Sequence, residues 1–141
     1  MTTPTETLNA LLERIEKAEG PDRELDGELC RILLGWTYEK MKGDRVPYWR
    51  TPRNAGLYYM RESGPLPLTS SLDAALTLVE RELPGWNPII GRHRDAGDRG
   101  DRWRGTLIPP DARLGTFALW GATPALALLA ALLRAKIGGA G

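Results

Sequence analysis

The run TPALALLAALL, residues 123–133, constrains the architecture more than any other part of the chain. Thr123 followed by Pro124 is typical of a helix start, because threonine caps a helix and proline fits its first turn. From Ala125 to Leu133 such a helix is apolar on every face, so protein must cover nearly its whole circumference. Burial between layers of one domain meets this requirement, and so does a subunit interface.

The same run ends an uncharged stretch of 20 residues, 114–133, which is long enough to span a bilayer. Gly115, Gly121 and Pro124 interrupt it, and the helix after Pro124 would be only about 20 Å long. We therefore expect a strand, a turn and a buried helix here. Because the N-terminus also has no signal-peptide pattern, we expect a soluble, cytoplasmic protein.

Three further helices are indicated by capping residues followed by apolar residues at helical spacing. The first opens at residues 3–6, Thr-Pro-Thr-Glu, and ends before Gly20. Asp22 caps the second, which Gly35 ends. The third opens at Ser70-Ser71 and stops at Pro84-Gly85.

Short aromatic and β-branched runs between these helices predict strands bounded by turn residues. They cover residues 36–41, 46–50, 57–60, 86–91, 103–108 and 116–120. Residues 42–44 are typical of a hairpin connection between the first two strands. With 141 residues, we expect a single α+β domain over residues 1–141, with mostly antiparallel strands, about four helices and a flexible tail at 138–141.

The formal net charge is +1, from 19 basic and 18 acidic residues, but it is unevenly distributed. Residues 1–40 carry five basic and nine acidic groups, a net of −4. Residues 41–62 carry a net of +3, and residues 91–114, with six basic and four acidic groups, a net of +2. The overall balance argues against a generally basic nucleic-acid binder, while both basic segments can hold a local anion site.

Common catalytic and metal-binding motifs are absent from the sequence, so we expect no enzyme activity, no metal and no cofactor. Cys30 falls in an apolar helical pattern, which favours a buried core residue over a nucleophile. Asp95, Asp98 and Asp101 lack the ligand spacing of a calcium loop. His93 lies between two arginines, and the sequence offers it no orienting carboxylate beyond its near neighbour Asp95.

The two basic segments are also aromatic, which suggests a site for an anionic, nucleotide-like ligand. A base can stack on tryptophan or tyrosine while arginines bind its phosphates with paired hydrogen bonds. The alternative is structural: tryptophans close the core and arginines cover them by cation–π contact. The candidate ligand-binding residues are Tyr48, Trp49, Arg50, Arg53, Arg92, His93, Arg94, Arg102, Trp103 and Arg104.

Three motifs occur in a familiar order: Gly-Pro-Asp-Arg-Glu-Leu-Asp at 20–26, Thr-Ser-Ser-Leu-Asp-Ala-Ala-Leu at 69–76, and Ala-Thr-Pro-Ala-Leu-Ala-Leu at 122–128. Through them the chain resembles the small phage and prophage proteins of the phage "ABA sandwich" domain family, over roughly residues 8–137. The resemblance implies an α/β/α sandwich, a phage or prophage origin and hence a bacterial host. It implies no established activity and no site residues.

Three functions are compatible with these features. The first is a non-enzymatic accessory protein that sequesters a small nucleotide-like signal of host defence, working as a homo-oligomer. In this hypothesis Trp49, Arg50, Arg53, Arg102 and Arg104 line one pocket. The second is a protein-binding inhibitor of a host enzyme, and the third is a nucleic-acid-binding accessory protein.

Overall fold

The computed structural model describes residues 5–39, 48–53, 56–60, 65–93, 102–111, 113 and 115–138, with the backbone alone for 38–39, 48–53, 56–60 and 93. Four helices and six strands lie within these residues, and each corresponds to an element expected from the sequence. The helices are α1 (Thr5–Lys17), α2 (Arg23–Leu34), α3 (Leu72–Glu82) and α4 (Pro124–Ile137). The strands are β1 (Thr37–Glu39), β2 (Tyr48–Arg53), β3 (Gly56–Met60), β4 (Asn87–His93), β5 (Arg102–Ile108) and β6 (Phe117–Gly121).

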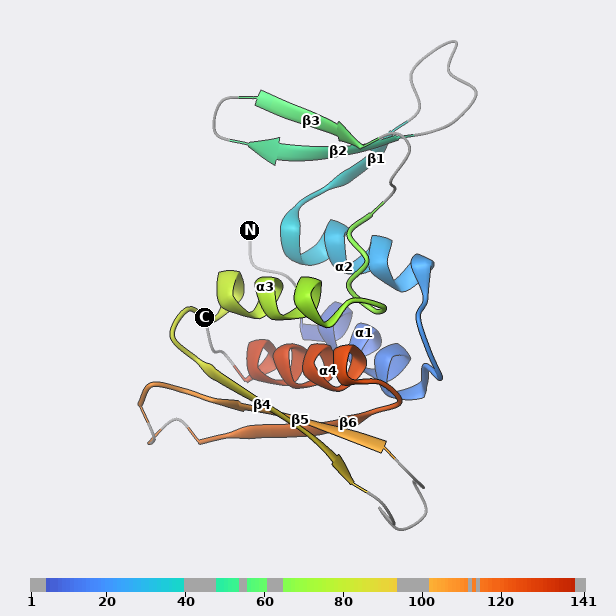
Figure 1. Cartoon of the computed structure of the whole chain (residues 1–141). Coiled ribbons are helices and arrows are strands. Elements are labelled where there is room, and N and C mark those ends of the chain that lie inside the picture. Colours follow the sequence, from blue (N-terminus) through green and yellow to red (C-terminus); the bar gives the residue numbers. More distant parts are fainter. Residues whose placement is uncertain are drawn as a thin grey trace.

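The described strands form two separate three-stranded sheets, β1-β2-β3 and β4-β5-β6, and all neighbours pair antiparallel. The expected α+β class, with antiparallel strands and four helices, is confirmed. In Figure 1, α1, α3 and α4 cover one face of the β4–β6 sheet, and the β1–β3 sheet lies beyond α2 on the other side of the helices. The layers therefore run sheet, helices, sheet, and not in the α/β/α order that the resemblance implies, because the strands are divided between two sheets.

Helix α4 is the centre of the core. It packs against the three strands of the β4–β6 sheet and against α1 and α3 (Figure 1). Its residues 125–133 are all buried, with at most 3% of any side chain exposed, whereas Arg134 is exposed. The apolar circumference seen in the sequence is thus covered by layers of the same chain.

Most of the expected helix boundaries are confirmed by capping contacts. The side chains of Asp22, Ser71 and Thr123 accept hydrogen bonds from backbone N–H groups in the first turns of α2, α3 and α4. Gly35 ends α2 with a φ of 72°, a left-handed conformation that favours glycine. The expected cap at residues 3–4 lies outside the described residues, and α1 is described from Thr5.

Two glycines allow α4 to lie close to the β4–β6 sheet. A Cβ atom on Gly105 would come within 2.6 Å of the carbonyl carbon and oxygen of Ala127. A Cβ atom on Gly121 would collide with the backbone of Ala127 and Leu126. Because these two glycines and Leu107 face the helices, they identify the inner face of the sheet.

At the carboxyl end, Gly138 caps α4 by donating its N–H to the carbonyl oxygens of Arg134 and Lys136. The rest of the expected flexible tail, residues 139–141, lies outside the described residues. No helix within the described ranges is both long and apolar enough to cross a bilayer.

Candidate functional site

The first half of the candidate site lies in β2. Tyr48, Trp49, Arg50 and Arg53 all belong to this strand, which is the middle strand of the β1–β3 sheet. The hairpin expected between the first two strands joins β1 to β2 in antiparallel register, with Thr37 opposite Arg50. The connection itself lies outside the described residues.

The second half meets at one end of the β4–β6 sheet. Arg92 and His93 end β4, while residues 102–104 begin β5. In the antiparallel register Arg92 lies opposite Trp103, and His93 lies opposite the first residue of β5. The sixth candidate of this half, Arg94, lies outside the described residues.

The two halves are not brought together within one copy of the chain. One belongs to β2 and the other to β4 and β5, and Figure 1 shows these strands on opposite sides of the helices. Helix α3 lies between β3 and β4 in the sequence, and it packs on α4. The helices therefore separate the strands that precede α3 from the strands that follow it. A single pocket lined by Trp49, Arg50, Arg53, Arg102 and Arg104 is therefore not formed within one chain.

On the inner face of the β4–β6 sheet, an arginine and a tryptophan are paired. Trp103 shares this face with Gly105 and Leu107, because side chains alternate along a strand. The guanidinium carbon of Arg92 lies 5.8 Å from the centre of the Trp103 ring. This distance is within the range of a cation–π contact.

The outer face carries a second pair of the same kind. Arg104 is exposed, and its guanidinium carbon lies 5.9 Å from the centre of the Trp120 ring on β6. The two residues are direct cross-strand neighbours. Arg102 shares this face by alternation, as expected from the sequence. We call Arg92, Trp103, Arg104 and Trp120 the Arg–Trp end of the β4–β6 sheet.

Sequence reasoning missed Trp120. It lies in the strand expected at residues 116–120, but the signal that links it to Arg104 is the register between β5 and β6. Strand propensity marks β5 and β6 as segments but does not reveal which residues of the two strands lie opposite each other. From the sequence alone, Trp120 is one of several tryptophans in predicted strands, and nothing distinguishes it as the partner of Arg104.

The charge of the three strands is one-sided. Strands β4, β5 and β6 contain Arg92, Arg102 and Arg104 together with His93, and within their bounds they contain no Asp or Glu. Within these strand bounds, the charged side chains of the described residues are therefore all cationic.

The sequence suggested either a ligand site or a structural role for the arginines and tryptophans, and the Arg–Trp end is compatible with both. The cation–π contacts are the structural role, because each arginine covers a tryptophan ring. A guanidinium that lies over a ring still presents N–H donors at its edge, and five such donors can bind a phosphate or carboxylate in pairs. The exposed Arg104 offers this chemistry on the outer face.

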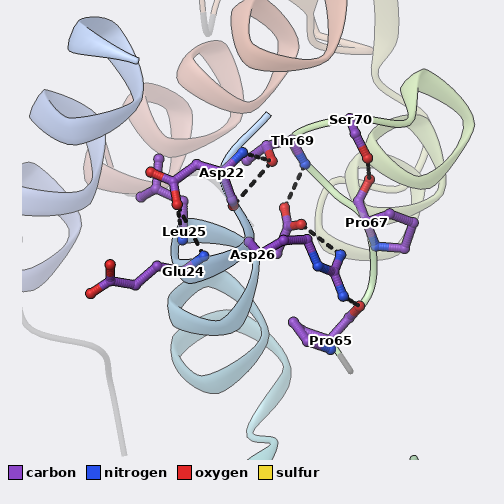
Figure 2. Close-up of polar contacts among 9 residues, drawn as sticks. Asp22, Glu24, Leu25, Asp26, Pro65, Pro67, Thr69 and Ser70 are labelled. Carbon is purple, nitrogen blue, oxygen red and sulfur yellow. Dashed lines mark hydrogen bonds and ion pairs between the residues drawn. The ribbon is translucent and has the colours of Figure 1, made fainter. Parts of the chain in front are cut away.

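A second polar cluster, which the sequence did not predict, lies between α2 and the segment before α3 (Figure 2). Asp26 is fully buried, its Oδ1 accepts the Thr69 N–H at 2.7 Å, and its Oδ2 accepts Arg23 Nη1 at 2.8 Å. Thr69 Oγ1 accepts the Asp22 N–H at 2.8 Å, and Arg23 Nη2 donates to the Pro65 carbonyl at 2.8 Å. Both carboxylate oxygens of Asp26 accept hydrogen bonds, so this cluster fastens α2 to the segment before α3.

The cysteine is part of the core, as expected. Cys30 is fully buried, and burial raises the pKa of its thiol to about 11. The thiol is therefore protonated at neutral pH, which suppresses its nucleophilicity.

Comparison of the chain with family models, with curated proteins and with solved structures finds no match. The resemblance to the phage ABA sandwich proteins therefore stays a prediction. Among the described residues no three His, Cys, Asp or Glu side chains are grouped to hold a metal ion, and Asp95, Asp98 and Asp101 lie outside those residues.

Proposed function

We propose that this protein is a non-enzymatic binding protein that takes a small, anionic, nucleotide-like ligand at the Arg–Trp end of the β4–β6 sheet. The observation that carries the proposal is the placement of two arginine–tryptophan pairs, one on each face, on three strands without a carboxylate. A ligand with a planar base and a phosphate matches the combination of an aromatic ring and a guanidinium that each pair presents.

The energies support such a ligand. Stacking of a base on an aromatic side chain contributes about 1–3 kcal/mol, and a hydrogen bond to a charged group about 1.5–3 kcal/mol. A base that stacks at the Arg–Trp end and a phosphate that accepts hydrogen bonds from Arg104 therefore supply several kcal/mol before the entropy of association is subtracted. Arg102, on the same face, adds a second cation within one strand pleat.

The biological role we propose is sequestration of a cyclic nucleotide signal of bacterial defence by a phage or prophage protein. The resemblance to phage proteins supports this role. If Trp49, Arg50 and Arg53 also contact the ligand, they must come from a second copy, since one chain holds the two sheets apart. Native mass spectrometry of protein from its host reports both the number of copies and any retained ligand.

Calorimetric titration with cyclic dinucleotides, cyclic trinucleotides and ADP-ribose tests the proposal. We expect heat of binding for at least one of these compounds, and Arg104→Gln to weaken that binding about tenfold to a hundredfold. The matched control is Arg31→Gln, because Arg31 is an exposed arginine of α2. Helix α2 and the β4–β6 sheet lie on opposite sides of α4 (Figure 1). No heat with any compound, or equal losses in both variants, would overturn the proposal.

Single-stranded nucleic acid is a second candidate. The observation that favours it is a sheet with helices on one face and, on the other, Trp120 beside Arg104. Aromatic and basic side chains on an open sheet face are a common platform for unstacked bases. Binding of a short oligonucleotide that weakens steeply with salt, with no heat from mononucleotides, would favour this candidate.

A protein partner is the third candidate. Ile89 is 50% exposed, and no other large hydrophobic side chain among the described residues is as exposed. It lies opposite Thr106, on the outer face that also carries Arg104. Retention of a stoichiometric host protein that Ile89→Ser releases would favour an inhibitor of a host enzyme over a ligand sponge.

A further inference from the structure

A pocket with a volume of about 290 Å³ lies between the carboxyl end of α2, the start of the segment 65–71 and one face of α3. Its lining is almost entirely apolar, from Leu34, Trp36, Leu66 and Leu78. Neither sheet contributes a described residue to this lining, so it is distinct from the Arg–Trp end. We call it the α2–α3 pocket.

One wall of the pocket is a regular stripe of α3. Ala74, Thr77, Leu78 and Arg81 follow at i, i+3, i+4 and i+7, which places them along a single helix face. Thr77 donates its hydroxyl proton to the carbonyl oxygen of Asp73 at 2.9 Å. This wall is therefore mostly apolar along its length and ends in a cation.

Among the described residues that line the pocket, Arg81 is the charged one. Its side chain is 66% exposed, and its Nε lies 4.0 Å from Glu82 Oε2, at the outer limit of an ion pair. The other oxygen of Glu82 is held more closely, at 3.3 Å, by Lys136 Nζ. The Nη groups of Arg81 can therefore donate to a further anion at the mouth of the pocket.

We propose that the α2–α3 pocket binds an amphiphilic anion, a carboxylate with a short aliphatic body. The body lies against Leu34, Leu66 and Leu78, and the carboxylate accepts hydrogen bonds from Arg81. A pocket with a volume of about 290 Å³ has room for a short aliphatic carboxylate such as octanoate. Largely apolar pockets with one or two placed polar groups are typical of small-molecule sites.

Titration of the protein with hexanoate, octanoate and octanol, followed by ¹H–¹⁵N spectra, tests this site. Because each buried methylene adds about a fourfold gain in affinity, octanoate should bind about tenfold or more tightly than hexanoate. Octanol has the same body without the charge, so it should bind about tenfold less tightly than octanoate. Equal affinities for hexanoate and octanoate, or shifts outside residues 34–36, 66 and 74–81, would overturn the proposal.

Two variants separate the parts of the site. Arg81→Gln should weaken octanoate about tenfold and leave octanol unchanged, while Ala74→Leu should fill the cavity and weaken both. Arg14→Gln replaces an exposed arginine of α1, is the matched control and should leave both affinities unchanged.

If Ala74→Leu does not fold, the Arg81→Gln variant tests the proposal by itself, because Arg81 is exposed. Unchanged octanoate binding in Arg81→Gln contradicts the proposal, and the proposed nucleotide site on the β4–β6 sheet is tested independently by Arg104→Gln.

Discussion

At the scale of single residues, Cys30 links burial to a measurable dependence on pH. The thiol pKa rises from 9.0 to about 11 because the side chain is buried in the core. Below pH 9 the thiol is protonated in both the folded and the unfolded chain. Between pH 9 and about 11 only the unfolded chain ionises, so the thiol's contribution to the free energy of unfolding falls by roughly 1.4 kcal/mol per pH unit.

The measurement is urea unfolding at several pH values from 7.5 to 10.5, with Cys30→Ala as the comparison. The wild-type protein should lose stability relative to Cys30→Ala as the pH rises through this window. In the folded protein at pH 8 the thiol should also resist alkylation until urea unfolds the chain. A constant difference between the two proteins across the window would contradict the account of Cys30.

Asp26 is the second residue with a defined structural effect. Its replacement by alanine leaves the buried Thr69 N–H without an acceptor and removes the anion that holds Arg23 (Figure 2). We expect Asp26→Ala to lower the free energy of unfolding by about 2 kcal/mol or more. Glu24→Ala, on the exposed side of the same helical turn, should change it by less than about 0.5 kcal/mol. Equal effects of the two substitutions in urea unfolding would show that the cluster does not fasten α2 to segment 65–71.

At the scale of elements, the contact between α4 and the β4–β6 sheet depends on small residues. We expect Gly105→Ala to lower the free energy of unfolding by about 1–3 kcal/mol, because its Cβ would lie 2.6 Å from the Ala127 backbone. Gly20→Ala is the matched control, since its Cβ would meet no atom within 4 Å. Thermal unfolding of both variants tests the contact, and equal midpoints would contradict the close packing of α4 on the sheet.

The helices were predictable from the sequence because their information is local. Asp22, Ser71 and Thr123 cap their own helices, and the apolar spacing of the next few residues marks the buried face. The strands were predictable as segments, with boundaries that moved by one to three residues, such as β4 continuing to His93. Their division into two sheets was not predictable, because pairing depends on how α3 and α4 pack between them.

The three motifs on which the family resemblance rests lie where elements of the fold contact one another. The motif at 20–26 supplies Asp26 and the motif at 69–76 supplies Thr69, which meet in the buried cluster. The motif at 122–128 supplies Ala127, which lies against Gly105 and Gly121. These residues fix the architecture, which explains why sequence motifs predicted helix boundaries better than they predicted the candidate site.

At the scale of the whole molecule, the net charge of +1 hides the positive net charge of residues 41–62 and 91–114. The sequence correctly brought Arg92, Arg102 and Trp103 close together, because these residues flank one strand connection. It could not show that residues 48–53 belong to another sheet, since only the packing of the helices separates the two basic segments. Within one chain the candidate site is therefore the Arg–Trp end alone, with Trp120 added.

The most direct test of the proposed site is to locate the bound ligand on the protein. ¹H–¹⁵N spectra of the labelled chain, recorded with and without each cyclic nucleotide and ADP-ribose, report which backbone amides respond. We expect the largest shifts at residues 89–93, 102–106 and 118–121, and their loss in Arg104→Gln. Shifts confined to the β1–β3 sheet or to the α2–α3 pocket, or no shifts with any of these compounds, would contradict a nucleotide site at the Arg–Trp end.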